Sequence, residues 1–273
     1  MAGLASQQAI SAATSELLKF AATMDDAALT TVASDLSGVA AGLAGSPQLR
    51  RMLTETTAQA EAKVALARRL FEGRIQQQSL ALVTLAVGER WNSGRDLVDG
   101  LRRLSRTASF LKAERAHELD GVEDEIFRFG RILDANPQLA LVLDDPATTA
   151  DARVAIVHRL LDGKAHTLTV DLLGGLAQDL GGRTFAHGVA ELVEQAAQRR
   201  DKIVAIATAA APLSDAEFQR LQSALTGIYA QQVVVHVIVD PAIGGGLRVR
   251  VGDEVIDGSI SGRLATIRAK LAR

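Results

Sequence analysis

The chain has 273 residues and a net charge of −2, from 30 Lys and Arg against 32 Asp and Glu, and it contains no cysteine. Disulfides, thiolate chemistry and cysteine metal sites are therefore excluded, and the balanced charge gives no support for nucleic-acid binding. Apolar residues make up 48% of the chain but aromatic residues only 3%. Ala and Leu supply most of this apolar content, which favours packed helices over a β-sandwich.

The N-terminal residues do not form a basic region followed by a long apolar core, so they do not resemble a signal peptide. The apolar runs at 80–87 and 203–213 are shorter than the ~20 residues that a membrane span needs. We therefore expect a soluble, cytoplasmic protein that reaches a membrane only through a partner.

An internal repeat occupies the first two thirds of the chain. Residues 46–73 match residues 136–163 at an offset of 90, and downstream the register slips by two residues, which indicates a change of loop length. We interpret the repeat as a duplicated helical unit. Identical pairs include Pro47/Pro137, Leu53/Leu143, Arg69/Arg159 and Gly73/Gly163, and after the slip Gly100/Gly188.

Both copies predict the same order of helices. A helix ends before Ser46-Pro47 or Asn136-Pro137, and a very short helix follows. An amphipathic helix and a longer apolar helix come next, and a GR turn leads to the last helix. The predicted ranges are 62–71, 76–90 and 95–108 in the first copy, and 152–161, 166–180 and 183–199 in the second. We expect helical-bundle domains at 1–107 and 108–199.

The last third, 200–273, changes to strand periodicity. A β-branched run at 202–211 is followed by Ser214 and Glu217, which form a capping box for a helix that ends near Tyr229. Strands are predicted at 233–240, 247–251 and 254–256, and a last helix carries Ile260, Leu264, Ile267 and Leu271 on one face. The fold class is therefore mainly α, with two tandem helical bundles and a small β-α-β-β-β-α domain.

The chain offers no recognisable catalytic, cofactor or metal site. Gly244, Gly245 and Gly246 lead into a strand, whereas a phosphate loop leads into a helix, so we expect them to let two strands cross closely. The five histidines lack metal-ligand spacing. Ala- and Leu-rich bundles are better suited to binding an amphipathic helix of a partner. We therefore expect a binding protein that is not itself an enzyme and has no cofactor.

The segment from Val239 to Ile267 closely resembles the hallmark of the delta subunit of F-type ATP synthases, the family of the oligomycin-sensitivity-conferring protein. The resemblance covers about residues 110–273, and the extra N-terminal copy is similar to long actinobacterial-type delta subunits. The matching positions are Asp240, Pro241, Gly245, Gly246, Val251, Gly252, Asp253, Val255, Ile256, Asp257, Gly258, Ser259, Arg263 and Leu264.

This resemblance implies a peripheral-stalk, or stator, subunit that does no chemistry and resists torque while the complex makes ATP. It implies that the helical domain holds the N-terminal helices of alpha subunits, and that the C-terminal domain binds the b-type stalk subunits. It also implies a peripheral position on the cytoplasmic face of the plasma membrane. The alternative is a generic helical adaptor for an unrelated partner.

One leucine stripe is a candidate partner groove. Leu168, Leu172, Leu176 and Leu180 recur every four residues on one face of the predicted 166–180 helix. The same stripe would equally serve to fill the core of the second bundle, and the sequence leaves both interpretations open.

Overall fold

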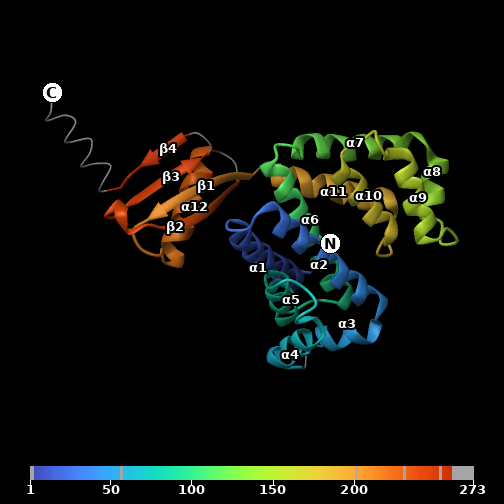
Figure 1. The fold of residues 1–273 in the computed structure, drawn as a ribbon, viewed down its shortest axis with the longest axis horizontal. Helices are drawn as coiled ribbons and strands as arrows, with labels where there is room; N and C mark the ends of the chain where they lie inside the picture. Colours follow the sequence, from blue (N-terminus) through green and yellow to red (C-terminus); the bar gives the residue numbers. More distant parts are fainter. Residues whose placement is uncertain (1–2, 56–57, 201, 230–231, 252–253, 260–273) are drawn as a thin grey trace. The chain divides into compact units, whose positions relative to one another are not determined.

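The computed structural model describes residues 3–55, 58–200, 202–229, 232–251 and 254–259. The chain divides into two compact units, Met1–Ala197 and Gln198–Arg273. The first unit is helical and the second contains a small sheet (Figure 1). This confirms the expected fold class.

The first unit begins with α1, which was not predicted, followed by five helices in the predicted order. Ser46 starts α3 as its N-cap by accepting a hydrogen bond from the backbone N–H of Leu49, and Pro47 occupies the first turn. Ser93 caps α6 in the same way, through the N–H of Asp96. The bounds are α1 Leu4–Ala21, α2 Asp26–Gly45, α3 Pro47–Thr54, α4 Ala60–Phe71, α5 Gln77–Gly88 and α6 Gly94–Arg115.

Helices α7 to α11 repeat the order of α2 to α6. In both copies the amphipathic helix is followed by a left-handed glycine, Gly73 with φ 73° and Gly163 with φ 70°. The predicted C-caps are therefore confirmed. The bounds are α7 Leu119–Ala135, α8 Pro137–Asp144, α9 Ala150–Leu161, α10 Thr167–Gln178 and α11 Phe185–Arg200.

Helix α6 is longer than predicted, since it continues past residue 108 to Arg115. It continues because its last two turns bury apolar side chains on two sides: Leu111 belongs to the first hydrophobic cluster, and Phe110 and Ala113 belong to the second. The expected division after residue 107 thus falls inside a continuous helix that both copies share. The assignment of the copies as separate domains stays a prediction.

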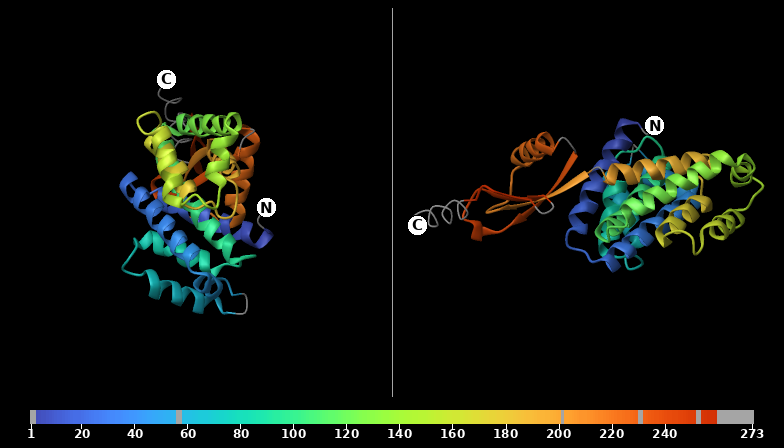
Figure 2. Two further views of the ribbon diagram at one scale, coloured as in Figure 1. Left: turned by 90° about the vertical axis from the view of Figure 1, so that its right-hand side faces the viewer. Right: turned by 90° about the horizontal axis from the view of Figure 1, so that it is seen from above.

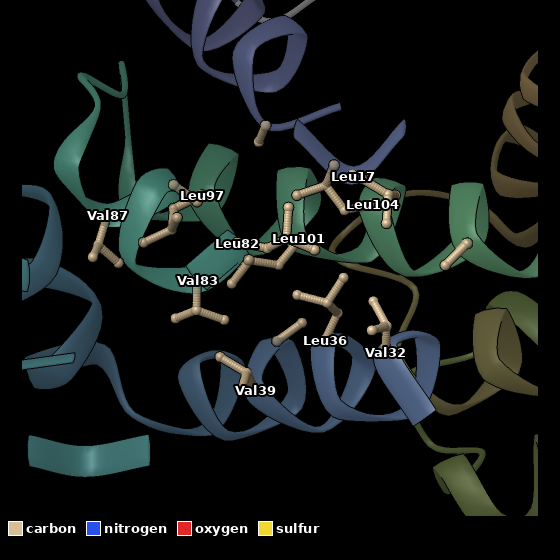
Figure 3. Close-up of a cluster of buried hydrophobic side chains, with 14 of the residues drawn as sticks. Leu17, Val32, Leu36, Val39, Leu82, Val83, Val87, Leu97, Leu101 and Leu104 are labelled. Carbon is tan, nitrogen blue, oxygen red and sulfur yellow. The ribbon is translucent and has the colours of Figure 1, made fainter. Parts of the chain in front are cut away.

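The first hydrophobic cluster lies between α1, α2, α5 and α6 (Figure 3). Leu36 and Val39 of α2 face Val83 of α5 and Leu101 of α6, and all four side chains are buried. Trp91 closes one end, where its indole N–H donates to the Ala86 carbonyl at 2.7 Å. The spacing of these residues on each helix matches the apolar stripe that a core-facing helix needs.

The second cluster repeats this plan with α7, α10, α11 and the far end of α6. Phe129 of α7 and Phe185 of α11 meet edge to face, with ring centroids 6.1 Å apart. The paired glycines of the repeat have the same role in both clusters. A side chain at Gly100 would collide with Trp91, and one at Gly188 would collide with Leu176.

The second unit is a four-stranded sheet in the order β2-β1-β3-β4. Strands β1 and β2 are parallel, and the β1–β3 and β3–β4 pairs are antiparallel. Helix α12 lies against one face of the sheet (Figure 2). The predicted last helix lies outside the described residues. The bounds are β1 Lys202–Ala209, α12 Asp215–Tyr229, β2 Gln232–Val239, the 3₁₀ turn η1 Pro241–Ile243, β3 Leu247–Val251 and β4 Glu254–Asp257.

One helix of the described chain is long and apolar enough to cross a membrane by length and composition alone. It is α2, Asp26–Gly45, with a mean hydropathy of 1.3 over its best window. The sequence analysis missed it because Thr, Ser and Gly interrupt its Ala, Val and Leu residues. Seven side chains of α2 are buried in the first cluster, which accounts for its apolar character.

Candidate partner-binding surfaces

The histidines are not brought together. His158 contacts Asp162 at 3.0 Å, His166 contacts Glu118 at 3.0 Å, and His187 contacts Glu191 at 3.3 Å. Across the described residues there is no group of three or more His, Cys, Asp or Glu side chains placed to hold a metal ion.

The leucine stripe lies mostly inside the second cluster, and its last member, Leu180, lies two residues beyond α10, which ends at Gln178 and not at the predicted residue 180. Leu172 and Leu176 are buried, at 8% and 4% exposure. Leu168 and Leu180 are half-buried and pack against the same cluster. The stripe thus contributes to the bundle core, and a partner helix would reach it only at its two ends. Its role as a partner groove stays a prediction.

Matching hydrogen bonds show that the two copies are built alike. Asp35 of α2 accepts from the backbone N–H of Gln76 at 2.9 Å and from the Ser79 hydroxyl at 2.7 Å. Ninety residues later, Glu125 of α7 accepts from the N–H of His166 at 2.9 Å and from the Thr169 hydroxyl at 2.5 Å. In each copy an acid on the long helix thus binds the positive N-terminus of the apolar helix.

The copies differ in the apolar side chains that they expose. Five large apolar residues of α7, α8 and α9 are exposed, and Leu141 is the most exposed of them at 70%. At the repeat positions of Phe127, Ile132 and Leu141 the first copy carries Ser37, Gly42 and Arg51 instead, whereas the positions of Val142 and Leu160 are apolar in both copies, as Met52 and Leu70. Comparing the two copies position by position is the sequence signal that would have found this surface. We call it the α7–α9 surface; its residues are Phe127, Ile132, Leu141, Val142 and Leu160.

A charged cluster joins α6 to the turn before α11. Arg102 pairs with Asp99 at 3.3 Å and with Asp179, and Arg183 pairs with Asp99 and Glu191. No sequence motif marks this cluster, because its members come from three separate segments. Paired, partly buried charges of this kind fix the relative position of the segments that they connect more than they raise the free energy of unfolding.

Two further side chains, Gln195 and Arg106, belong to the same contact between α6 and α11. The Gln195 amide donates to the Arg103 carbonyl at 2.8 Å and to the Thr107 hydroxyl at 3.0 Å. Burial lowers the pKa of Arg106 to about 10, with Glu191 acting in the opposite direction. The guanidinium therefore stays charged at neutral pH.

The described signature residues of the C-terminal unit make local backbone contacts. The Asp240 carboxylate accepts from the N–H of Ala242 at 2.9 Å and starts the turn that holds Pro241. Gly245 and Gly246 have φ of 129° and 76°, which side chains rarely adopt. The signature positions Gly252, Asp253, Arg263 and Leu264 lie outside the described residues.

A close crossing explains the last glycines of the signature. A Cβ on Gly246 would lie 2.5 Å from the Gly258 carbonyl oxygen, and the N–H of Gly258 donates to the Leu247 carbonyl at 2.8 Å. The Asp257 carboxylate accepts from both the N–H and the hydroxyl of Ser259. The glycines lead into β3, and Gly246 lies beside the Gly258–Ser259 backbone where the antiparallel β3–β4 pair continues; their structural role stays a prediction.

The face of the sheet opposite α12 carries a mixed apolar and basic surface. Cross-strand pairing sets Ile206 beside Arg250 and Arg250 beside Val255, while Thr208 lies beside Arg248. Alternation along each strand places these side chains opposite Ala205, Ala207 and Val249, which pack under α12. Arg250 is exposed and Val255 is 54% exposed. We call this the open sheet face.

Known proteins resemble this chain over most of its length. A family model described as the ATP synthase delta (OSCP) subunit matches residues 106–271. A protein named ATP synthase subunit delta from Streptomyces avermitilis is 45% identical over 241 residues, covering 88% of each chain. Its namesake from Parafrankia sp. is 41% identical over 276 residues, covering 98% of this chain and 99% of the relative.

A solved structure also matches. A chain in the cryo-EM structure of the Toxoplasma gondii mitochondrial ATP synthase hexamer is 20% identical and covers 62% of this chain and 95% of that chain, with a TM-score of 0.28. A likeness of this size does not establish a shared arrangement. The sequence relatives, in contrast, span both helical copies and the C-terminal unit, whereas the family model begins within α6.

Proposed function

The chain belongs to the ATP synthase delta (OSCP) subunit family, and on this premise we propose how it connects the parts of that enzyme. It is a non-catalytic peripheral-stalk subunit of the F-type ATP synthase, and so part of a membrane-bound complex. The observation that carries this function is the 41% identity over 98% of the chain to a delta subunit of matching length.

We propose that the helical unit holds the N-terminal helices of the alpha subunits in the catalytic head. The α7–α9 surface supports this, because exposed Leu141 and Phe127 offer the apolar contacts that an amphipathic helix seeks. Leu168 on α10 and Leu180 just beyond its end would extend the contact, with Leu172 and Leu176 supporting it from inside the core.

We propose that the C-terminal unit binds the end of the b-type stalk subunits through its open sheet face. Arg250 on this face would pair with an acidic side chain, and Ile206 and Val255 would supply apolar contact, whereas Arg248 is already paired with Asp257 at 3.0 Å. Interfaces that resist torque need to bury about 800 Å² per partner around an apolar centre. The complex would thereby place this subunit on the cytoplasmic face of the membrane.

A generic helical adaptor for an unrelated partner is not favoured. Such a protein would share helical packing with delta subunits, but it would not share 45% identity over 88% of the chain with one of them. The signature at Asp240 to Ser259 is likewise a feature of sequence and not of helical packing alone.

The test is reconstitution of coupled activity. Membranes stripped of this chain are expected to lose proton-driven ATP synthesis, while the detached head still hydrolyses ATP. Adding back the purified chain is expected to restore synthesis, because a stator transmits torque without taking part in the chemistry.

A matched pair of variants makes the test specific to the α7–α9 surface. Leu141→Asp is expected to weaken restoration at least roughly tenfold, since a charge replaces an apolar anchor. Gln138→Asp, which changes a neighbouring exposed position on the same helix, is expected to restore synthesis normally. Synthesis that does not depend on the added chain would contradict the proposed function.

A further inference from the structure

We propose that the first helical copy carries its own docking site, a cleft between α2, α3 and the end of α4, for an amphipathic helix that presents two apolar side chains and a carboxylate. This inference rests on the proposed function, since the helix would come from the catalytic head. It adds a second site, on the copy that the family model does not cover.

The cleft has a volume of about 330 Å³. Its floor is apolar and half-buried, and is formed by Leu49, Leu70, Phe71 and Ile75, with Val39 beneath them. Clefts that bind ligands or side chains specifically start at about this size. Figure 3 shows Val39 on α2 at the edge of the first cluster, so the floor rests on packed core side chains.

The repeat shows why the cleft is open in the first copy. Ser34 and Gly38 line it on α2, and a Cβ on Gly38 would meet nothing within 4 Å. Ninety residues later the same positions hold Asp124 and Arg128, which pair with each other. The small residues of the first copy thus leave an opening where the second copy carries an ion pair.

The charge of the cleft specifies the chemistry of its occupant. Arg74 lines the cleft, and the ion pairs found among the described residues do not include it. The other charged lining residue, Asp35, already binds the start of α5 through Gln76 and Ser79. A carboxylate on the bound helix would therefore pair with Arg74 while its apolar neighbours cover Leu70 and Phe71.

The experiment uses the full chain and a synthetic peptide with the N-terminal sequence of the alpha subunit from the same organism, followed by calorimetry. We expect two peptides to bind per chain, one on the α7–α9 surface and one in the cleft. Gly38→Gln should fill the cleft and reduce the number to one, and Arg74→Glu should weaken that site roughly 3- to 10-fold.

Gly42→Gln is the matched control. It makes the same change one turn further along α2, where a Cβ also meets nothing within 4 Å, and Gly42 is not among the cleft residues. Both variants gain helix propensity to a similar degree, so a loss confined to Gly38→Gln belongs to the cleft. The control is expected to bind two peptides.

Each contrary outcome overturns the inference in a distinguishable way. One bound peptide that Gly38→Gln leaves unchanged but Leu141→Asp removes would overturn the cleft and preserve the proposed function. No binding by the unchanged chain would overturn both. A dimer seen by sedimentation and abolished by Gly38→Gln would show that a second copy of the chain occupies the cleft instead.

Discussion

Gly246 is the residue of the C-terminal signature whose role the structure defines most sharply. Its φ of 76° and the nearby Gly258 carbonyl leave no place for a side chain. The two requirements are independent, because the first concerns its own backbone and the second concerns the segment that crosses it. A phosphate site would need neither of them.

Gly246→Ala is expected to destabilise the C-terminal unit by at least ~2 kcal/mol, since a left-handed alanine and a collision with backbone act together. The chain has one Tyr and one Trp, and they report on different units: Tyr229 on α12 and Trp91 in the first cluster. The tyrosine transition in urea should move to lower denaturant while the tryptophan transition stays in place.

Gly227→Ala is the control for this change. Gly227 lies on α12 in the same unit, and a Cβ there meets nothing within 4 Å. This variant should raise stability by about 0.5–1 kcal/mol through helix propensity. If Gly246→Ala left the tyrosine transition unchanged, the close crossing would not be a constraint on the fold.

At the scale of single elements, the start of α12 shows a complete capping box. The N–H of Glu217 donates to the Ser214 hydroxyl at 3.4 Å, and the N–H of Ser214 donates to the Glu217 carboxylate at 2.9 Å. The hydrogen bond from the Ser214 hydroxyl is the main cause that lowers the pKa of Glu217 below 4.5. The sequence motif predicted this geometry correctly.

The lowered pKa gives a pH dependence of known sign. A carboxylate whose pKa is lower in the folded state stabilises the fold above its unfolded pKa, and this contribution is lost as pH falls through the folded value. The stability of the C-terminal unit should therefore fall as pH drops below 4.5. Asp257 adds to the same trend, because its bonds to Ser259 lower its pKa.

Glu217→Gln should flatten this acid limb of the curve of thermal midpoint against pH, as followed by the tyrosine signal. Asp215→Asn, an exposed acid in the same first turn, is the control and should keep the limb. Equal flattening by both variants would attribute the effect to the net charge of the helix start and not to the capping box.

Helix α6 is the element that makes the two copies one unit. One face supplies Leu101, Leu104 and Leu111 to the first cluster, and another supplies Phe110 and Ala113 to the second. Its charged residues Asp99 and Arg102 bind the turn before α11. A helix shared in this way connects the two copies without an intervening loop.

At the scale of the whole molecule, we expect each copy to fold alone only with α6 included. A fragment of residues 1–115 should unfold cooperatively, whereas 1–107 should lose at least ~2 kcal/mol, because it lacks buried Ala108 and Leu111. Residues 94–200 should likewise be more stable than 116–200, which lacks buried Phe110.

Circular dichroism in urea measures both pairs of fragments, and Trp91 fluorescence follows the first pair. The longer member of each pair is its control, since it differs only by residues of α6. Equal stability of 1–107 and 1–115 would show that the first copy is complete at residue 107, as the sequence prediction of a separate 1–107 domain requires.

The sequence by itself determined the local structure. Helix caps, left-handed glycines and the strand pattern depend on neighbours within a few residues, so Ser46, Gly73, Gly163 and the Ser214–Glu217 box were predictable. The repeat and the family signature are also properties of sequence alone, and they identified the family before any packing was known.

Only the tertiary structure decided which face of each helix is used, because burial depends on segments far apart in the chain. It placed Leu172 and Leu176 in the core and left Leu141 exposed. It also extended α6 through both clusters and opened the cleft beside Gly38. A leucine stripe is the same pattern whether it meets the bundle or a partner, and only the surrounding atoms distinguish the two.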